Sequence, residues 1–406
     1  MYLLDTICAE YFISLAVRDG YLDQVAHEPY LSEGFSMKHV VSSFSIVSMF
    51  AVLAMLFAPM ASAQDSITLN GAGSSFDNPL FSKAFSEYTK INPGVRVNYQ
   101  SVGSGAGIKQ LTEKTVDFGA SDAPMTDDQL KAAGGPDAVI HVPVTLGAVA
   151  ITYNLPGLSA PLKLDGATLA AIFEGTITKW NDDAIKKLND GVDLPGTDIA
   201  VVERSDGSGT TNIFTTYLAS VSSDWKDKVG VGLSVKWPVG IGAKGSEGVA
   251  GQVGQLEGAI TYVELSYAEQ NKLATADVQN SAGSFVAPSA KGATACAAAS
   301  ASKLPTDLRV MIAGCTGSDA AIYPISGFSW VVLATNQTDP AKGAALVGLL
   351  DWLIHDGQQY GADLSYAPLP NAVVEQATAR LQLVTANGQP LLAGTPSASP
   401  AASPAS

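Results

Sequence analysis

Residues 67–88 read ITLNGAGSSFDNPLFSKAFSEY, which predicts a short apolar strand, a glycine-rich turn and an amphipathic helix. Phe81, Phe85 and Tyr88 recur every three to four residues and therefore share one face of that helix. The same alternation continues with a predicted strand at 95–100 and a short helix after the glycine-rich turn that follows it. Strands that alternate with helices predict an α/β fold.

The pattern extends through most of the chain. Apolar runs predict strands at 116–120, 142–152, 199–202, 258–263 and 328–334, and a long helix at 341–355. A further helix is expected to bury one face, made of Ile213, Phe214, Tyr217, Leu218 and Val221.

One glycine-rich segment matches a nucleotide-binding pattern. Gly240–Gly245 fits G-x-G-x-x-G, but it follows Trp237-Pro238 rather than a clean strand. Gly248 and Gly251 disfavour a helix after it. The segment is therefore interpreted as a loop, not as a dinucleotide site.

Composition limits the classes of function. The chain has 406 residues, of which 47% are hydrophobic, which is enough apolar material for a soluble protein of two domains. Its net charge of -15, without a run of Lys or Arg, argues against nucleic acid as a partner. An anionic ligand would need a specific local site, because general electrostatic attraction could not bind it.

The N-terminal region resembles targeting sequence. Met37-Lys38-His39 precedes an apolar stretch, 40–60, that ends in Ala61-Ser62-Ala63. This order is typical of a signal peptide at 37–63, cleaved near Ala63, and the alternative is a membrane anchor. Residues 1–36 fit no part of such a signal and are interpreted as a non-native upstream extension. The Pro/Ser/Ala tail, 394–406, is expected to be disordered.

The mature chain would keep two cysteines, Cys296 and Cys315. Export favours a disulfide between them, and two buried free thiols are the alternative. No metal site is expected, since the mature chain has His141 and His355 only, far apart in sequence.

Three junctions share one design, a glycine-rich turn with a hydroxyl side chain at the start of a helix. They centre on Ser75, on Ser104 and on Ser208-Gly209-Thr210. Free backbone N–H groups and a partial positive charge at a helix start favour an oxyanion, and glycine allows close approach. Ordinary helix capping is the alternative for each junction.

Two charged residues sharpen this prediction. The planar guanidinium of Arg204 can hold two oxygens of a tetrahedral anion, and Asp206 could orient it; a surface ion pair is the alternative. Asp122 would repel an anion unless the anion carries a proton, as phosphate does and sulfate does not. Its alternative role is a cap or turn residue.

Six motifs together resemble the phosphate-binding protein of the bacterial phosphate ABC transporter, across about Leu69 to Ala379. They are Gly71–Phe76 (GAGSSF), Val116–Pro124 (VDFGASDAP), Ile177–Asp182 (ITKWND), Arg204–Thr210 (RSDGSGT), Val235–Gly240 (VKWPVG) and Ala259–Glu264 (AITYVE).

The resemblance implies a two-lobed periplasmic-binding-protein fold of type II, in which each lobe is a mixed sheet flanked by helices. Two hinge crossovers would join the lobes, and phosphate would lie between them. By motif position it also implies the phosphate ligands. These are Ser75, the N–H of Phe76, Ser104 and Asp122 from lobe one, and Arg204, Ser208, the N–H of Gly209 and Thr210 from lobe two, with Asp206 orienting Arg204. The family usually has threonine in place of Ser75, and the hydroxyl needed for the role remains.

Crossovers near 144–145 and 320–321 would divide the chain into lobe one, 64–144 plus 321–393, and lobe two, 145–320. The expected protein is a periplasmic monomer without cofactor or catalytic residues, which binds inorganic phosphate and delivers it to a membrane permease. A secreted phosphatase is one alternative. A binder of sulfate, molybdate or arsenate is another, and arsenate is hardest to exclude because it is protonated like phosphate.

Overall fold

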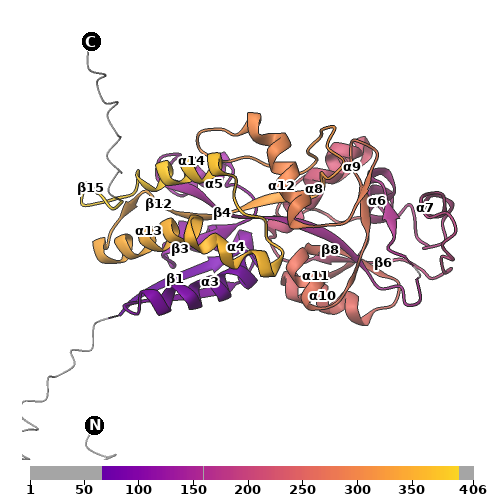
Figure 1. Ribbon diagram of the computed structural model, residues 1–406, viewed down its shortest axis with the longest axis horizontal. Helices are drawn as coiled ribbons and strands as arrows, with labels where there is room; N and C mark the ends of the chain where they lie inside the picture. The colour runs from indigo at the N-terminus through magenta and orange to yellow at the C-terminus, as the bar shows by residue number, and fades with distance from the viewer. Residues whose placement is uncertain (1–65, 159, 393–406) are drawn as a thin grey trace, which may run out of the picture. The chain divides into compact units, whose positions relative to one another are not determined.

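The computed structural model describes residues 66–158 and 160–392, and the predicted signal peptide, the upstream extension and the C-terminal tail lie outside these residues. The first part of the described chain alternates strands and helices as predicted (Figure 1). Strands β2 and β3 pair in parallel with β1 on either side. The elements are β1 (Ile67–Gly73), α3 (Asn78–Ile91), β2 (Val95–Ser101), α4 (Ser104–Thr112), β3 (Phe118–Ser121) and α5 (Asp127–Ala132).

One long strand, β4 (Val139–Tyr153), connects two halves of the main sheet. All of its 15 residues are buried. Val139–Ala148 pair antiparallel with β12 (Ser326–Ala334), and Val149–Tyr153 pair antiparallel with β8 (Ala259–Glu264). Figure 1 shows β4 running from the half that contains β1 into the half that contains β6. The sheet order is β2-β1-β3-β12-β4-β8-β6-β7, and β9 pairs with the end of β4.

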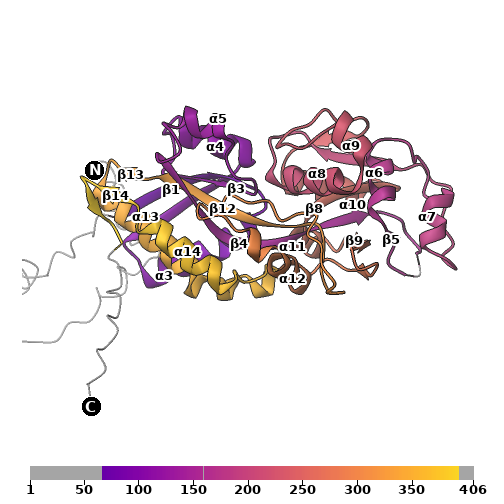
Figure 2. The same cartoon turned by 90° about the horizontal axis from the view of Figure 1, so that it is seen from above.

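The second half of the sheet is built from β8 and its parallel neighbour β6, with helices packed around them (Figure 2). Three short strands form a separate sheet with the order β11-β10-β5. The elements are β5 (Lys163–Leu164), α6 (Gly166–Phe173), α7 (Asp183–Leu188), β6 (Ala200–Arg204), α8 (Gly209–Val221), α9 (Ser223–Lys228), β7 (Ile241–Ala243), α10 (Gly245–Gln255), α11 (Leu265–Gln270), β9 (Ala274–Thr275), β10 (Asp277–Gln279), β11 (Phe285–Val286), α12 (Ala290–Ser300) and η1 (Ala301–Lys303).

After β12 the chain stays with the first half. Figure 1 shows α13 and α14 in the half that contains β1 and β3; α13 contacts β1 and β4, and α14 contacts β4 and α13. The elements are β13 (Asn336–Gln337), α13 (Pro340–Ile354), η2 (Asp356–Tyr360), η3 (Ala362–Leu364), α14 (Asn371–Leu381), β14 (Thr385–Ala386) and β15 (Gln389–Pro390).

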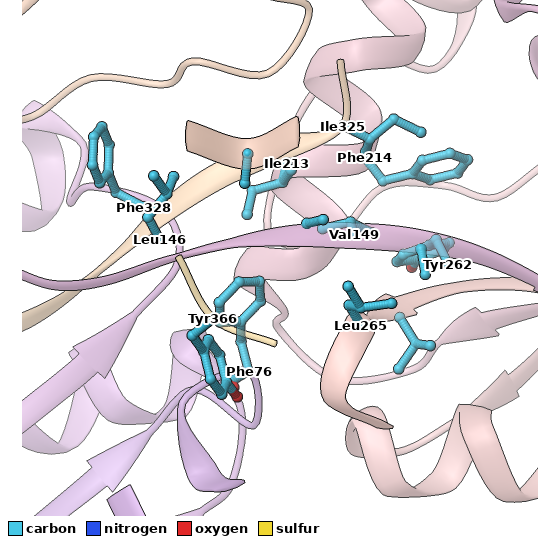
Figure 3. Close-up of a cluster of buried hydrophobic side chains, with 14 of the residues drawn as sticks. Phe76, Leu146, Val149, Ile213, Phe214, Tyr262, Leu265, Ile325, Phe328 and Tyr366 are labelled. Carbon is cyan, nitrogen blue, oxygen red and sulfur yellow. The ribbon is translucent and has the colours of Figure 1, made fainter. Parts of the chain in front are cut away.

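Apolar packing follows β4 from one half to the other. Phe76 and Leu146 lie on one side of the crossing and Val149 and Tyr262 on the other, in one cluster of buried side chains (Figure 3). Successive side chains of β4 point to opposite faces of the sheet, and all of them are buried. Both faces of the sheet are therefore covered along this strand. Strand β4 therefore contributes to the apolar core of both halves.

Two sequence-based expectations were wrong. Val221, expected on the buried face of α8, is 42% exposed because it is the last residue of the helix, where the chain turns away. The segment after Gly245, expected to be loop, forms helix α10. Burial of Val249 and Val253 in that helix outweighs the low helix propensity of its glycines.

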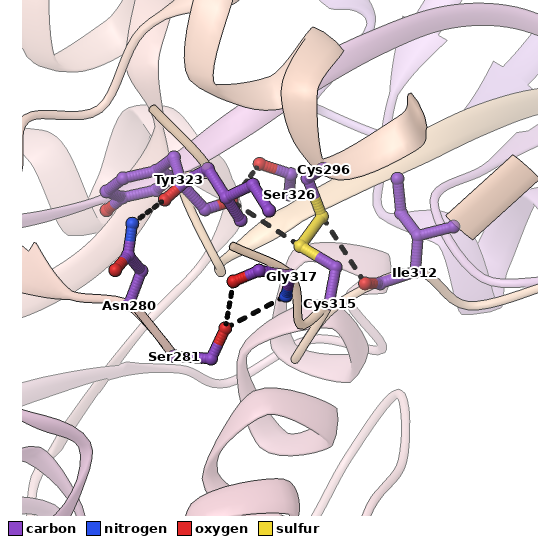
Figure 4. Close-up of a disulfide and its surroundings, with 9 residues drawn as sticks. Asn280, Ser281, Cys296, Ile312, Cys315, Gly317, Tyr323 and Ser326 are labelled. Atoms are coloured by element: carbon purple, nitrogen blue, oxygen red, sulfur yellow. Dashed lines mark hydrogen bonds between the residues drawn. A yellow bond between two sulfur atoms is a disulfide. The ribbon is translucent and has the colours of Figure 1, made fainter. Parts of the chain in front are cut away.

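A disulfide joins Cys296, on α12, to Cys315 in the segment before β12 (Figure 4). Hydrogen bonds hold the same segment: the side-chain amide of Asn280 donates to the carbonyls of Ala320 and Ile322, at 3.1 and 3.0 Å. The returning chain is thus attached to the second half shortly before it enters β12.

Part of this returning segment also contacts the first half. The guanidinium of Arg309 donates to the carbonyl of Met125 at 3.0 Å and forms an ion pair with Asp127. The indole N–H of Trp330, on β12, donates to the carbonyl of Leu308 at 3.0 Å. Residues 308–309 therefore pack against the half that contains β3 and β12.

Candidate anion-binding site

The predicted site residues lie where strands end and helices begin. Ser75 follows β1, Ser104 begins α4 after β2, and Asp122 follows β3. In the second half Arg204 ends β6, and Ser208 caps the start of α8. The carboxyl ends of parallel strands and the N-termini of the following helices are the usual place for an anionic ligand in an α/β fold.

The two halves meet directly at these residues. The backbone N–H of Gly209 donates to Ser104 Oγ at 3.0 Å, and Thr210 Oγ1 donates to Asp122 Oδ2 at 3.1 Å. The N–H of Gly105 donates to the carbonyl of Gly207 at 2.9 Å. The structure therefore brings together Ser104 and Asp122 from one half with Gly209 and Thr210 from the other.

Gly209 permits this approach because it has no side chain. A Cβ atom built there would lie 2.6 Å from the backbone nitrogen of Asp122. Neither backbone could shift cheaply at such a distance, because both belong to junctions between a strand and a helix. The glycine that the sequence places after Ser208 thus has a packing role as well as an N–H group.

Arg204 is fixed by Asp206 in a two-point ion pair. Arg204 Nε donates to Asp206 Oδ1 at 2.7 Å, and Nη2 donates to Oδ2 at 2.6 Å. The Arg204 side chain is 2% exposed. Burial lowers the pKa of Arg204, but the hydrogen bonds and charge of Asp206, together with the smaller effects of Tyr262 and Asp122, raise it overall. Burial raises the pKa of Asp206, but the hydrogen bonds and charge of Arg204, together with backbone N–H groups such as that of Gly245, lower it overall. The pair is therefore held in its charged form.

The remaining guanidinium nitrogen points toward a pair of serines. Arg204 Nη1 donates to Ser246 Oγ at 3.4 Å, and Ser246 Oγ lies 2.9 Å from Ser75 Oγ. The N–H of Ser246, at the start of α10, donates to Ser75 Oγ at 3.1 Å. The start of α10, from the segment that the sequence predicted as loop, therefore joins the predicted junctions at Ser75, Ser104 and Ser208.

Asp122 is 1% exposed and surrounded by hydroxyl groups. Ser74 Oγ and Ser329 Oγ donate to Oδ1, and Thr210 Oγ1 donates to Oδ2. Burial raises the pKa of Asp122, against the opposing effects of the Ser74 hydrogen bond and the charge of Arg204. A buried carboxyl group in such a place can accept a hydrogen bond from a protonated ligand.

Two predicted ligands make local contacts. Ser208 Oγ accepts the N–H of Thr211 at 3.1 Å, which is the capping bond of α8. The N–H of Phe76 donates to Ser74 Oγ at 2.9 Å, and that hydroxyl donates to Asp122. Both residues lie at the site, but their polar groups are engaged with their own segments.

Four residues of the cluster were missed by the sequence analysis: Ser74, Asp77, Ser246 and Ser329. Ser74 and Asp77 flank a predicted ligand, which was the available signal. Ser246 was hidden because its helix was not predicted. Nothing in the sequence around Ser329 marks it, since it lies in an apolar strand.

The arrangement is that of a buried anion site with one acceptor. The carboxyl group of Asp122 accepts hydrogen bonds from hydroxyl groups of both halves. The site also contains the guanidinium of Arg204 and the starts of α4, α8 and α10. Over residues 66–158 and 160–392 there is no group of three or more His, Cys, Asp and Glu side chains that could hold a metal ion. In the same residues no helix is both long and apolar enough to cross a membrane.

Comparison with known proteins shows the family to which the chain belongs. Residues 58–356 match the PBP superfamily domain. The phosphate-binding protein PstS of Pasteurella multocida is 42% identical over 343 residues, which cover 84% of this chain and 98% of the relative. The PstS protein of Haemophilus influenzae is 42% identical over 324 residues, which cover 80% of this chain and 94% of the relative.

Solved structures share the fold. A high affinity periplasmic phosphate-binding protein bound with phosphate superposes with a TM-score of 0.62 at 23% identity, covering 78% of this chain and 94% of that one. A phosphate-binding protein from Stenotrophomonas maltophilia gives 0.60 at 20% identity, with the same coverage. The two halves joined by β4 are thus the two lobes of a periplasmic-binding-protein fold, and the chain belongs to the PstS family of phosphate-binding proteins within the PBP superfamily.

Proposed function

We propose that this protein binds inorganic phosphate between its two lobes and delivers it to the membrane permease of a phosphate ABC transporter. The observation that supports this most is the buried cluster of polar groups between the lobes. Asp122 accepts a hydrogen bond from Thr210 of the other lobe, and Arg204 reaches the hydroxyl pair of Ser246 and Ser75. The names of the relatives, at 42% identity over most of the chain, support the same ligand.

The phosphate ligands are taken to be those that the motifs indicated: Ser75, the N–H of Phe76, Ser104, Asp122, Arg204, Ser208, the N–H of Gly209 and Thr210. Several of these groups contact one another across the lobes, for example Thr210 and Asp122. Phosphate would replace such contacts with its own oxygens. Asp206 orients Arg204 by occupying two of its nitrogens, which leaves Nη1 for the ligand.

Asp122 gives the site its selectivity. Phosphate near neutral pH carries at least one hydroxyl group, which can donate to the carboxylate. Sulfate has none, so its oxygen would face the carboxylate with like charge. Sites that require a ligand hydroxyl reject an analogue without it by roughly 10⁴-fold or more.

The ligand must enter by separation of the lobes, because the site residues are buried. Arg204 is 4% exposed and Asp122 1%. We take lobe one as 64–144 plus 321–393 and lobe two as 145–320. The change of partner along β4, from β12 to β8 after Ala148, supports a crossing near the proposed boundary at 144–145. Contacts of 308–309 with lobe one suggest that the returning segment spans the hinge.

The relatives are binding proteins, and we propose no catalytic step and no cofactor for this chain. The site offers hydrogen bonds to a ligand that leaves unchanged.

We further propose that the protein is a periplasmic monomer, exported by the signal peptide at 37–63 and cleaved near Ala63.

The test is analysis of the purified protein. Anion analysis of the denatured protein is expected to release about one phosphate per chain, and calorimetry of the stripped protein is expected to show tight, reversible binding of phosphate. A phosphatase assay with a phosphate ester, with and without divalent ions, is expected to show no turnover. Absence of phosphate binding, or turnover of the ester, would overturn the proposal.

A further inference from the structure

Asp77 is a second carboxyl group buried behind the site. It lies at the N-cap of α3 and is 0% exposed, but its side chain makes no capping bond to that helix. Its Oδ2 atom lies 2.7 Å from Ser329 Oγ. Its Oδ1 atom has no hydrogen-bond partner among the described residues. Burial of an ionised carboxylate with a single hydrogen-bond donor would cost free energy, so the protonation state of Asp77 has to be considered.

Ser329, on β12, stands between two carboxyl groups. Its Oγ lies 2.7 Å from Asp77 Oδ2 and 3.1 Å from Asp122 Oδ1. The hydroxyl has one proton and can donate it to one of them. If both carboxyl groups were ionised, one would face the hydroxyl's lone pairs. If Asp77 carries a proton, it donates to Ser329, and Ser329 donates to Asp122.

In the part of the chain that the structure describes, no cation lies within hydrogen-bond or ion-pair distance of the Asp77 carboxyl group. The titratable groups that act on it or face it are Asp122 and the hydroxyls of Tyr99 and Tyr366, which donate to the carbonyls of Ser74 and Phe76. Glu264, itself buried, accepts from Tyr366. The cation of the site, Arg204, acts on Asp122.

The directions of the pKa shifts agree with the hydrogen-bond pattern at Ser329. Burial, followed by the charge of Asp122, raises the pKa of Asp77 well above its usual value, and the hydrogen bond from Ser329 only partly opposes this. Burial also raises the pKa of Asp122, but there the Ser74 hydrogen bond, the charge of Arg204 and the bonds from Ser329 and Thr210 all oppose the rise. The two carboxyl groups thus have unequal surroundings, and the proton belongs on Asp77.

We propose that Asp77 is a neutral carboxylic acid that, through Ser329, holds Asp122 as an ionised hydrogen-bond acceptor for the ligand. Asp77 is in this view a positioning residue, and its proton stays in place when the ligand binds. The chain of donors runs from Asp77 to Ser329 to Asp122, so the free lone pairs of Asp122 are directed to a ligand hydroxyl. This inference rests on the proposed binding of a protonated anion.

The first test detects the proton itself, in the full mature protein without added phosphate. Infrared difference spectra between wild type and Asp77→Asn at pH 8 are expected to show the carbonyl stretch of a protonated carboxyl group that the variant lacks. Asp117→Asn is the control, because Asp117 is paired with Lys342 and is expected to contribute only carboxylate bands. Absence of a protonated band assigned to Asp77 would overturn the inference.

The second test measures phosphate binding by calorimetry from pH 5 to 9. Asp77→Asn keeps a neutral donor, so its affinity is expected to stay within about twofold of wild type, with the same pH profile. Asp77→Leu and Ser329→Ala break the chain of donors, and each is expected to weaken binding roughly tenfold, the scale for one hydrogen bond to a charged group. Ser326→Ala is the matched control on β12, because that hydroxyl donates only to the carbonyl of Tyr323.

A displaced pH profile in Asp77→Asn would show that wild-type Asp77 is charged and would overturn the inference. So would unchanged affinity in Ser329→Ala. If Asp77→Leu does not fold, the Asn variant and Ser329→Ala still decide. Failure of wild type to bind phosphate would defeat the proposed function, whereas the infrared band tests the proton on Asp77 independently of it.

Discussion

Replacement of Arg204 by lysine keeps the positive charge but removes the planar guanidinium and its several nitrogen donors. Asp206 occupies Nε and Nη2 of Arg204, at 2.7 and 2.6 Å, and Nη1 remains for the site. A lysine has one nitrogen, which cannot pair with Asp206 and also reach the position of Nη1. At least one charge-assisted hydrogen bond to phosphate is then lost. Such a bond contributes about 1.5–3 kcal/mol, so the dissociation constant is expected to rise roughly 10- to 150-fold.

Arg309→Lys is the matched control. Arg309 also pairs with an aspartate two residues away, Asp307, at 2.8 Å, but it lies outside the site and is 25% exposed. The assay is calorimetry with phosphate on stripped protein, and urea unfolding verifies that each variant is folded. The control is expected to bind like wild type. A folded Arg204→Lys protein with a dissociation constant within threefold of wild type would refute the role given to the guanidinium.

Three further changes test the packing, the disulfide and the buried acid. Gly209→Ala is expected to weaken phosphate binding roughly 5- to 150-fold, since overpacking of about 1–3 kcal/mol would oppose closure; Gly251→Ala, whose Cβ meets no atom within 4 Å, should bind normally in the same calorimetric titration. Replacement of both Cys296 and Cys315 by alanine opens a loop of sequence separation 19 and is expected to lower the free energy of unfolding by about 3 kcal/mol in urea melts; an unchanged midpoint would count against it. Folded Asp77 keeps a proton that the unfolded chain loses above about pH 4, so the stability due to that proton is present below pH 4 and declines as the pH rises. Asp77→Asn should therefore gain on wild type by about 1.4 kcal/mol per pH unit above pH 4, up to the folded pKa, and parallel stability curves would contradict this.

Much of the fold could be predicted because its elements are locally regular. The apolar face of α3, with Phe81, Phe85 and Tyr88 all buried, follows helical spacing. The Thr-x-x-Gln pattern at Thr126 and Gln129 is typical of a capping box, and both of its hydrogen bonds are present. The long apolar run at 142–152 predicts a buried strand, and it lies within β4, whose 15 residues are all buried. In these segments local pattern and tertiary packing agree.

Prediction failed where tertiary contacts override local preference. Helix α10 contains Gly248 and Gly251, which propensity disfavours, yet burial of Val249 and Val253 stabilises it. Because this helix was missed, so was Ser246 at its start.

The candidate site shows the same division. Motifs marked Ser104, Gly209 and Thr210, and the structure brings them together with Asp122. Ser329 reaches the site from the middle of β12, and only the pairing of β12 with β3 places it there. A contact that depends on the order of strands leaves no mark in the sequence around a residue.

The account depends on the Asp122 carboxylate accepting a hydrogen bond from a hydroxyl group of the ligand. The most direct measurement is side-by-side calorimetry of wild type and Asp122→Asn with phosphate and with sulfate at neutral pH. We predict that wild type prefers phosphate by roughly 10⁴-fold or more and that the variant loses most of this preference. Comparable binding of sulfate by wild type, or full preference for phosphate in the folded variant, would contradict it.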